Sequence, residues 1–394
     1  MPRHPELSPT VTAISGSVYS KLAQKLATHK GTVYPLHVGD TWMEPPTGCR
    51  MEDLRVGEHP GMHRYTAPQG HPALLAAVAR YVEAKSGVAT TPDNVLIAAG
   101  ATGALGAAVG ALVSPGDEVL LLAPYWPLIA GIVRSFHGTP VAVPFLGRVT
   151  TPAEAVEAVE SQRTERTVAL YLSTPNNPTG LIIPGEVLRA LVAWAEEHEL
   201  WVIADEVYEH YQFDGQHVYT RPFDPARTFA AHSFSKAYGM AGNRCGYVVG
   251  PAEAMGELRK VATHTFYSTP TASQLAAVKA LGSGYPDAGP GDAWANVARQ
   301  QYCETGSWAA ARLGIPAPQG STFLFLDVAD QLERGDAGGD PLDDFLARCG
   351  ERGLFLAPGP SFGPYPTHVR LCFTAAPPER VKEGVEVLAE ILGR

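Results

Sequence analysis

The stretch His232-Ser-Phe-Ser-Lys-Ala-Tyr-Gly-Met-Ala-Gly-Asn-Arg244 is the most informative part of this sequence. Its first two residues end a run at 228–233 that has the composition of a buried strand. Two serine hydroxyls, one lysine amine and one arginine guanidinium therefore leave the end of a strand on a turn of small residues. The stretch indicates where the chemistry of this chain lies, and the rest of the sequence can be read outward from it.

Short apolar runs alternate with longer helical stretches around it, separated by many of the 40 glycines and 34 prolines, and this alternation is typical of an α/β protein. We expect strands that are apolar throughout, as strands buried on both faces are. They are Val95–Ala99, Glu118–Ala123, Pro140–Phe145, Val168–Ser173, Leu200–Ala204, Thr228–Ser233 and Gly246–Gly250. Apolar residues three and four apart predict helices at Leu74–Lys85, Gly103–Val113, Glu154–Gln162 and Gly185–His198.

A segment rich in glycine and proline, Gly282–Asp292, marks a boundary or turn. Beyond it we expect a second domain with a long helix at Trp294–Leu313, strands at Thr322–Val328 and His368–Thr374, and helices near Pro341–Arg352 and Pro378–Leu392. The low-complexity run Arg334–Asp340 is expected to be a surface loop. We therefore divide the chain into an N-terminal arm with the first part of a small domain (1–45), a large domain (46–284) and a small C-terminal domain (285–394).

Composition narrows the class of protein. The 394 residues suggest roughly two to three domains, and 45 % hydrophobic with 18 % charged residues indicates an ordinary globular chain. The net charge of −10 disfavours nucleic acid as a partner. The sequence contains no apolar run of about 18 residues, so no membrane span is predicted. Five widely spaced cysteines without a C-x-x-C pair favour a reducing, cytoplasmic setting. Pro60-Gly61 between His59 and His63 disfavours a helical metal site.

Further motifs lie upstream of the opening stretch. The set is Ser173-Thr-Pro-Asn-Asn-Pro-Thr-Gly180, Ala204-Asp-Glu-Val-Tyr208, Ser233-x-Ser235-Lys236 and Arg244. Together they resemble the fold-type I aminotransferases of class I/II, which use pyridoxal 5'-phosphate. The resemblance spans nearly the whole chain, from Ile14 to Val369-Arg-Leu371. It implies the fold of those transferases: a large domain with a mixed, mostly parallel seven-stranded sheet flanked by helices, and a smaller α+β domain.

The resemblance implies that Lys236 forms an imine with the cofactor aldehyde and then moves a proton between the substrate α-carbon and the cofactor. The residues agree with this role, because a carbanion next to an amine needs an electron sink that the protein attaches and orients. Asp205 would pair with the ring nitrogen and keep it protonated. Tyr208 and Asn177 would hydrogen-bond to the phenolate oxygen of the ring. The structural alternatives are a surface lysine, a helix N-cap for Asp205, core packing for Tyr208 and a turn residue at Asn177.

The phosphate of the cofactor needs backbone N–H groups, hydroxyls and a cation, preferably at a helix N-terminus. Gly100-Ala101-Thr102, between a predicted strand and the helix that follows, suits this role, although Thr102 is also a plausible N-cap. By the resemblance, Ala101, Thr102, Ser233, Ser235 and Arg244 hold the phosphate.

Two aromatic residues complete the expected cofactor site. Trp126, in Pro-Tyr-Trp-Pro, resembles the aromatic residue that stacks on the cofactor ring, with Tyr125 as the alternative. Tyr65 resembles the tyrosine that reaches the phosphate bound by the partner subunit. The resemblance therefore implies a homodimer with shared active sites.

Arg370 lies inside an apolar strand, where a guanidinium is costly to bury unless it meets an anion. We expect it to bind the α-carboxylate of the substrate through two hydrogen bonds, with an internal salt bridge as the alternative. Gly39 matches the glycine whose backbone approaches that carboxylate, and Asn177 is the third expected substrate contact. The family's Gly-Glu-Pro-Asp-Phe is Gly39-Asp-Thr-Trp-Met43 here, so the loop beside the substrate side chain is altered.

The expected reaction is ping-pong transfer of an amino group between an L-amino acid and a 2-oxo acid by a pyridoxal-phosphate-dependent aminotransferase. The cofactor-holding residues do not separate this from the alternative, a lyase, cyclase or oxidase of specialised amino-acid metabolism on the same scaffold. A transcription regulator with an aminotransferase-like domain is disfavoured. Such a regulator would need a DNA-binding module in front of that domain, and the dozen or so residues before Ile14 are too few for one. Neither nucleic acid nor a membrane is an expected partner.

Overall fold

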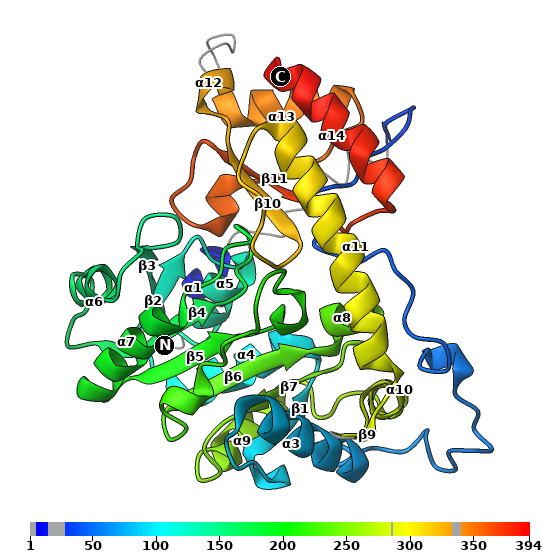
Figure 1. Cartoon of the computed structure of the whole chain (residues 1–394). Coiled ribbons are helices and arrows are strands. Elements are labelled where there is room, and N and C mark those ends of the chain that lie inside the picture. Colours follow the sequence, from blue (N-terminus) through cyan, green and yellow to red (C-terminus); the bar gives the residue numbers. More distant parts are fainter. Residues whose placement is uncertain (1–4, 15–27, 285–286, 333–339) are drawn as a thin grey trace.

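The computed structural model describes residues 5–14, 28–284, 287–332 and 340–394. Figure 1 shows a larger body built around a sheet and a smaller body beside it, with the long helix α11 (Pro290–Leu313) running along both. The surface loop was predicted at Arg334–Asp340, and residues 334–339 of it lie outside the described residues. Among the residues described, no helix combines the length and the apolar character needed to cross a membrane.

The sheet of the larger body has the order β1-β7-β6-β5-β4-β2-β3. Strand β7 is antiparallel to both of its neighbours, whereas the remaining pairs are parallel. The strands are β1 (Val95–Ala98), β2 (Glu118–Ala123), β3 (Thr139–Pro144), β4 (Thr167–Ser173), β5 (Trp201–Asp205), β6 (Thr228–Ser233) and β7 (Gly246–Val249). The predicted mixed, mostly parallel seven-stranded sheet is therefore confirmed.

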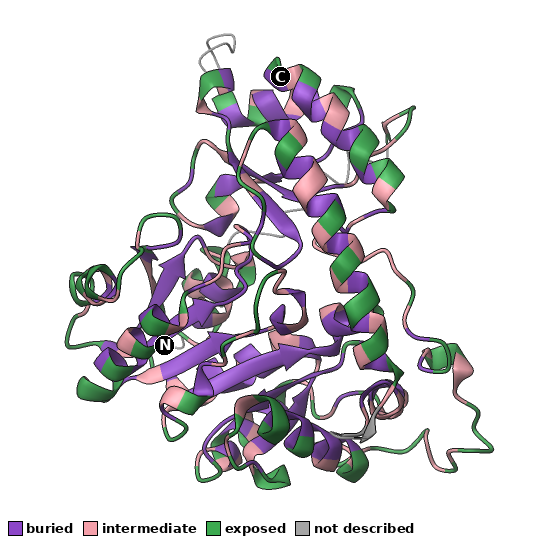
Figure 2. Ribbon diagram, viewed as in Figure 1, coloured by how far each residue is buried: buried purple, intermediate pink, exposed green. Residues whose placement is uncertain are grey.

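Helices cover both faces of this sheet, and this explains why its strands are apolar throughout. In β1, Val95 and Ile97 face the core under α3, α6, α7 and α10, whereas Leu96 and Ala98 face the core under α4, α5 and α9. Figure 2 shows most strands of this sheet buried and the helices exposed on their outer sides. The edge strand β3 is the exception, with a single buried residue, Val143. The helices are α3 (Pro72–Ser86), α4 (Gly100–Leu112), α5 (Pro127–Ser135), α6 (Pro152–Glu160), α7 (Gly185–Glu197), α9 (Met255–Thr265) and α10 (Thr271–Leu281).

The helices differ from the predictions in two respects. Helix α4 begins at Gly100, so the residues expected between strand and helix form its first turn. The set predicted from periodicity also omits α5, α9 and α10. In α10 the buried face includes the polar residues Ser273 and Gln274 beside Ala276 and Ala277, so the buried residues do not form a single apolar stripe. A signal based on spacing three and four apart misses such helices.

The smaller body contains an antiparallel sheet of order β10-β12-β11, formed by β10 (Phe323–Asp327), β11 (Ala357–Pro358) and β12 (His368–Cys372). Helices α11, α12 (Ala329–Leu332), α13 (Pro341–Glu351) and α14 (Pro378–Leu392) lie with it. The segment around Tyr34–Leu36 joins this body, since Tyr34 bridges to Leu354 and the Cys372 N–H donates to the Leu36 carbonyl at 2.7 Å. In contrast, α1 (Pro9–Thr12) packs against α5 of the larger body. The domain boundaries at 45/46 and 284/285 stay a prediction.

Short elements complete the described chain. The boundary segment contains β8 (Gly282–Gly284) and β9 (Asp287–Ala288), and α11 begins at Pro290, earlier than the predicted Trp294. The short helices are α1 (Pro9–Thr12) and α8 (Phe234–Ala237). The 3₁₀ turns are η1 (Met51–Asp53), η2 (Pro92–Asn94), η3 (Glu209–Tyr211), η4 (Arg221–Phe223), η5 (Ala241–Asn243) and η6 (Gly359–Phe362).

Gly246, the first residue of β7, allows the sheet to approach the start of α4. A Cβ there would lie 2.7 Å from the His232 carbonyl oxygen and 2.9 Å from the Ala101 nitrogen. We predict that Gly246→Ala lowers the free energy of unfolding by about 1–3 kcal/mol through overpacking, measured by urea denaturation. Gly106→Ala is the matched control, because nothing lies within 4 Å of its added Cβ and alanine favours a helix. Equal stability of the two variants would contradict this packing.

Candidate active site

A cavity of about 190 Å³ opens where the carboxyl ends of the central strands meet the smaller body. Every residue predicted for the site except Tyr65 lines it. The lining residues are Gly39, Ala101, Thr102, Leu105, Trp126, Asn177, Asp205, Val207, Tyr208, Ser233, Ser235, Lys236, Ala241, Arg244 and Arg370. Carboxyl ends of parallel strands are the usual ligand crevice of an α/β sheet.

Register explains how distant motifs meet. In the parallel pairs β4–β5 and β5–β6, Ser173 lies opposite Asp205 and Asp205 lies opposite Ala231. Strand β6 ends two residues later at Ser233, whose hydroxyl oxygen accepts the Ser235 N–H at 3.0 Å and caps α8. This one-turn helix carries Lys236 into the cavity.

The Lys236 amine is enclosed by the protein. It donates to the Gly39 carbonyl and lies 3.8 Å from Asp40 Oδ1. Burial lowers the pKa of Lys236, and the neighbouring Asp40 carboxylate opposes this effect. A lowered pKa increases the neutral fraction of the amine, which is the form that acts as a nucleophile and as a base.

Asp205 is a buried carboxyl group at the end of β5. The Tyr171 hydroxyl donates to its Oδ2 at 2.7 Å, and the Val207 N–H donates to Oδ1 at 3.4 Å. Burial raises the pKa of Asp205 to about 6, although the Tyr171 hydrogen bond acts in the opposite direction. A carboxylate in such a place is suited to pair with a protonated nitrogen of a ligand.

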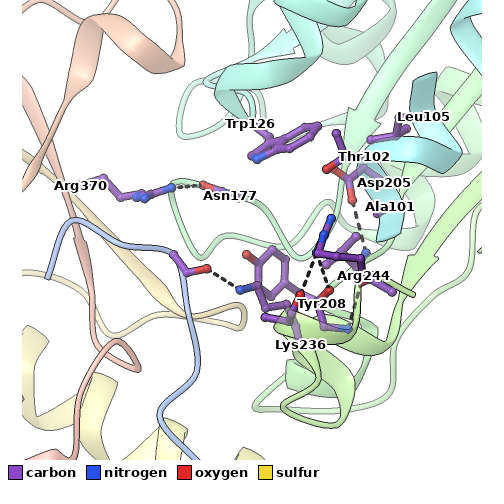
Figure 3. A pocket seen from close by; sticks show the side chains of 15 residues that line it. Ala101, Thr102, Leu105, Trp126, Asn177, Asp205, Tyr208, Lys236, Arg244 and Arg370 are labelled. Atoms are coloured by element: carbon purple, nitrogen blue, oxygen red, sulfur yellow. Dashed lines mark hydrogen bonds between the residues drawn. The ribbon is translucent and has the colours of Figure 1, made fainter. Parts of the chain in front are cut away.

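Trp126 and Tyr208 lie on opposite sides of the cavity (Figure 3). Trp126 precedes α5 as its N-cap residue. Tyr208 is buried, and burial raises the pKa of its hydroxyl, which therefore stays protonated. Tyr125, the alternative stacking residue, is not among the lining residues, and its backbone N–H donates to the Phe362 carbonyl at 3.0 Å.

One end of the cavity is built to attract an anion. Gly100 has φ of +69°, and a Cβ there would lie 2.5 Å from Arg244 Nη2, so only glycine allows the guanidinium so close to the start of α4. Arg244 also donates to the carbonyls of Ala99 at 3.3 Å and Ala241 at 2.9 Å. A helix N-terminus beside a guanidinium and hydroxyl groups is a typical phosphate site.

Arg370 lies at the other end of the cavity, on β12 of the smaller body. Its Nη1 donates to Asn177 Oδ1 at 3.0 Å, and its Nη2 donates to the His37 carbonyl at 2.8 Å. The guanidinium lies over the rings of Phe323 at 4.2 Å and Phe362 at 4.8 Å. These contacts orient a planar cation that matches the two oxygens of a carboxylate.

One predicted site residue lies outside this cavity. Tyr65 is 87 % exposed and contacts the ring of Tyr267, with centroids 5.2 Å apart. It is expected to reach the phosphate bound by the partner subunit, and this role stays a prediction. The altered loop at Trp42, Met43 and Glu44 does not line the cavity either. Tyr171 was not predicted as a site residue, because a tyrosine inside an apolar strand is typical of a core position, and its contact with Asp205 follows only from the register of β4 and β5.

Comparison with known proteins agrees with this geometry. The profile of aminotransferase class I and II matches residues 33–388. The aspartate/prephenate aminotransferase of Thermus thermophilus is 32 % identical over 346 residues, 85 % of this chain and 84 % of that protein. An asparagine–oxo-acid transaminase of Streptococcus mutans is 29 % identical over 321 residues, 78 % of this chain and 79 % of that protein. The structure of Thermus thermophilus aspartate aminotransferase with maleate has a TM-score of 0.84 at 28 % identity, covering 98 % of this chain and 100 % of that one.

The chain therefore belongs to the class I and II aminotransferases. It is a pyridoxal-phosphate-dependent aminotransferase, and the alternative of a lyase, cyclase or oxidase is not favoured. The residues present fit the cofactor: an enclosed amine for its aldehyde, a buried carboxyl group for its ring nitrogen, and a guanidinium at a helix N-terminus for its phosphate.

The raised pKa of Asp205 predicts a pH-dependent stability. Its pKa rises from 3.8 to about 6 in the folded protein, so the folded state binds this proton more tightly. The contribution of this proton to the free energy of unfolding is fully present below about pH 4 and is lost as the pH rises through 6. The total loss is about 3 kcal/mol. We predict that cofactor-free Asp205→Asn is more stable than the parent at pH 7.5 and that the difference shrinks at pH 5, as measured by urea unfolding.

The matched control is Asp93→Asn, a change at an exposed aspartate of η2. This variant should unfold like the parent at both pH values. A difference between Asp205→Asn and the parent that is the same at pH 7.5 and pH 5 would contradict the assignment of the shift to Asp205.

Proposed function

We propose that this chain transfers the amino group of an L-amino acid to a 2-oxo acid in a ping-pong reaction in which Lys236 holds the cofactor and moves the proton. One observation carries the proposal: the Lys236 amine, the Asp205 carboxyl group and the Arg370 guanidinium line the same cavity. Pyridoxal 5'-phosphate supplies an aldehyde that reacts with amines and a ring that accepts electrons from the neighbouring carbon.

Lys236 acts first as the amine that attaches the cofactor and then as the base and acid at the substrate α-carbon. The lowering of the Lys236 pKa by burial supports this role, because the neutral amine accepts a proton and returns it within one enclosed space. The Gly39 carbonyl and Asp40 hold the amine when it is charged.

The cofactor is held by groups from several strand ends. Arg244, Thr102, Ser233, Ser235 and the backbone at Ala101 bind the phosphate. Asp205 pairs with the ring nitrogen, Trp126 stacks on the ring, and Tyr208 and Asn177 hydrogen-bond to its phenolate oxygen. All of these residues line the cavity, and this shared position supports the assignment.

Arg370 binds the α-carboxylate of the amino acid, with Gly39 and Asn177 beside it. Its planar guanidinium is already oriented by Asn177 and by the Phe323 ring, so little freedom is lost when a substrate binds. Aspartate is the first amino acid to test, because several relatives are named aspartate aminotransferases.

We propose a homodimer in which Tyr65 completes the phosphate site of the partner subunit. Tyr65 is 87 % exposed and does not line the cavity of its own chain. Further large apolar side chains exposed in the same part of the chain, Met51 and Val56, are suited to an interface.

We also propose that the enzyme works in the cytoplasm. All five cysteines are free thiols, and Cys49, Cys245, Cys349 and Cys372 are buried. Free thiols are typical of a reducing compartment.

Removal of the Lys236 amine tests the proposed function. Lys236→Ala is expected to lower kcat by at least about 10²–10⁴-fold, the contribution typical of a general acid–base group, while the protein stays folded by circular dichroism. The matched control Lys260→Ala removes an exposed lysine that pairs with Glu257 at 2.7 Å, and it should retain full activity. A near-normal kcat for transamination by the Lys236→Ala variant would refute the proposal.

Mixed dimers test the shared site. Tyr65→Phe is expected to weaken cofactor binding by about tenfold, the effect of losing one hydrogen bond to a charged group. In a mixed dimer with Lys236→Ala, the site that keeps Lys236 receives the intact Tyr65 of the partner subunit. Its cofactor affinity should therefore return to the parental value, measured as activity at limiting cofactor.

The control for this experiment is a mixed dimer of Tyr65→Phe with the double variant Lys236→Ala/Tyr65→Phe, which offers no intact tyrosine. Affinity that stays weakened in both mixtures would show that Tyr65 serves its own subunit or none.

A further inference from the structure

Tyr171 lies directly behind the cavity and has no role in the function proposed above. It belongs to β4, where it pairs with Ile203 of β5, and Ser173 two residues later pairs with Asp205. Successive side chains alternate between the faces of a sheet. Tyr171 and Asp205 therefore project from the same face, the one covered by α4, α5 and α9.

The contact between the two side chains is short and fully enclosed. The Tyr171 hydroxyl donates to Asp205 Oδ2 at 2.7 Å, and both residues are buried. Burial raises the pKa of Tyr171 well above its usual value, and the Asp205 charge raises it further. The phenol therefore stays protonated over the working pH range and always acts as the donor.

The other charged groups near Asp205 are already paired with one another. His232, on the neighbouring strand β6, contacts Glu209 Oε1 at 3.0 Å and Glu206 Oε2 at 3.7 Å. Tyr219 donates to Glu209 at 2.6 Å. His232 is therefore paired with two other acids. Among the described residues, the Tyr171 hydroxyl is the side-chain donor to Asp205.

We propose that Tyr171 is a positioning residue for Asp205: its hydroxyl keeps the carboxylate ionised and fixes its orientation, and thereby keeps the ring nitrogen of the bound cofactor protonated. This inference rests on the proposed pairing of Asp205 with that nitrogen. Without the phenol, two effects act in the same direction. The carboxyl group becomes a stronger base that takes the shared proton, and it also gains freedom to turn away.

The test uses the holoenzyme reconstituted with cofactor labelled with ¹⁵N in the ring. In Tyr171→Phe, the ¹⁵N chemical shift is expected to move toward the value of an unprotonated ring. The rate of the half-reaction with an amino acid should fall by about tenfold to hundredfold, the range for loss of one hydrogen bond to a charged group. The KM for the amino acid should change little, because the Arg370 site is intact.

Two further proteins separate this role from a purely structural one. Tyr365→Phe removes another buried hydroxyl, for which no hydrogen-bond partner lies among the described residues, and it should leave the ¹⁵N shift unchanged. Replacement of Tyr171 by 4-aminophenylalanine restores an N–H donor of the same length and should restore ring protonation. This protein also carries the test if Tyr171→Phe fails to fold, and loss of ring protonation in it would overturn the proposal.

Asp205→Asn distinguishes the inference from its premise. If its ¹⁵N shift moves and that of Tyr171→Phe does not, the role of Tyr171 is refuted while the pairing of Asp205 with the ring stands. If neither variant changes the shift, the pairing itself is wrong, and the inference fails with it.

Discussion

Parallel pairing of β4, β5 and β6 in one fixed register decides where the reactive groups of this protein meet. It brings Ser173 opposite Asp205 and Asp205 opposite Ala231, two residues before the Ser233 cap of α8. The buried Asp205 carboxyl group and the enclosed Lys236 amine then face one cavity. Helices on both faces of the sheet exclude water behind these groups, and this exclusion causes the shifts in their pKa values.

The charged groups of the cavity lie at separate places around it, and a different ligand group is expected at each (Figure 3). Arg244 and the start of α4 attract an anion at one end, and Arg370 attracts a carboxylate at the other. The Arg370 guanidinium comes from β12 of the smaller body. The segment that includes Gly39 passes between the two bodies and contacts Lys236. The site therefore depends on how the two bodies are held together, and neither body contains it alone.

Much of this arrangement follows from the sequence because motif residues sit at strand ends, where an apolar run stops and a polar group follows. The sheet was predictable from continuous apolar runs, and Lys236, Asp205 and Arg370 stood out as charges next to or inside such runs. Helix α10 was missed because its buried face includes the polar residues Ser273 and Gln274, which interrupt the apolar pattern. Tyr171 was missed because a tyrosine in an apolar strand looks like core, and only the register between strands shows that its hydroxyl reaches Asp205.

The role of Lys236 as the attachment point can be tested by locating the cofactor on the chain. Holoenzyme is reduced with borohydride, which fixes the cofactor to the amine that holds it, and is then digested and mapped by mass spectrometry. We expect a single modified residue, Lys236. Attachment to a different lysine, or recovery of the Lys236 peptide without the cofactor from fully loaded enzyme, would show that Lys236 does not hold the cofactor.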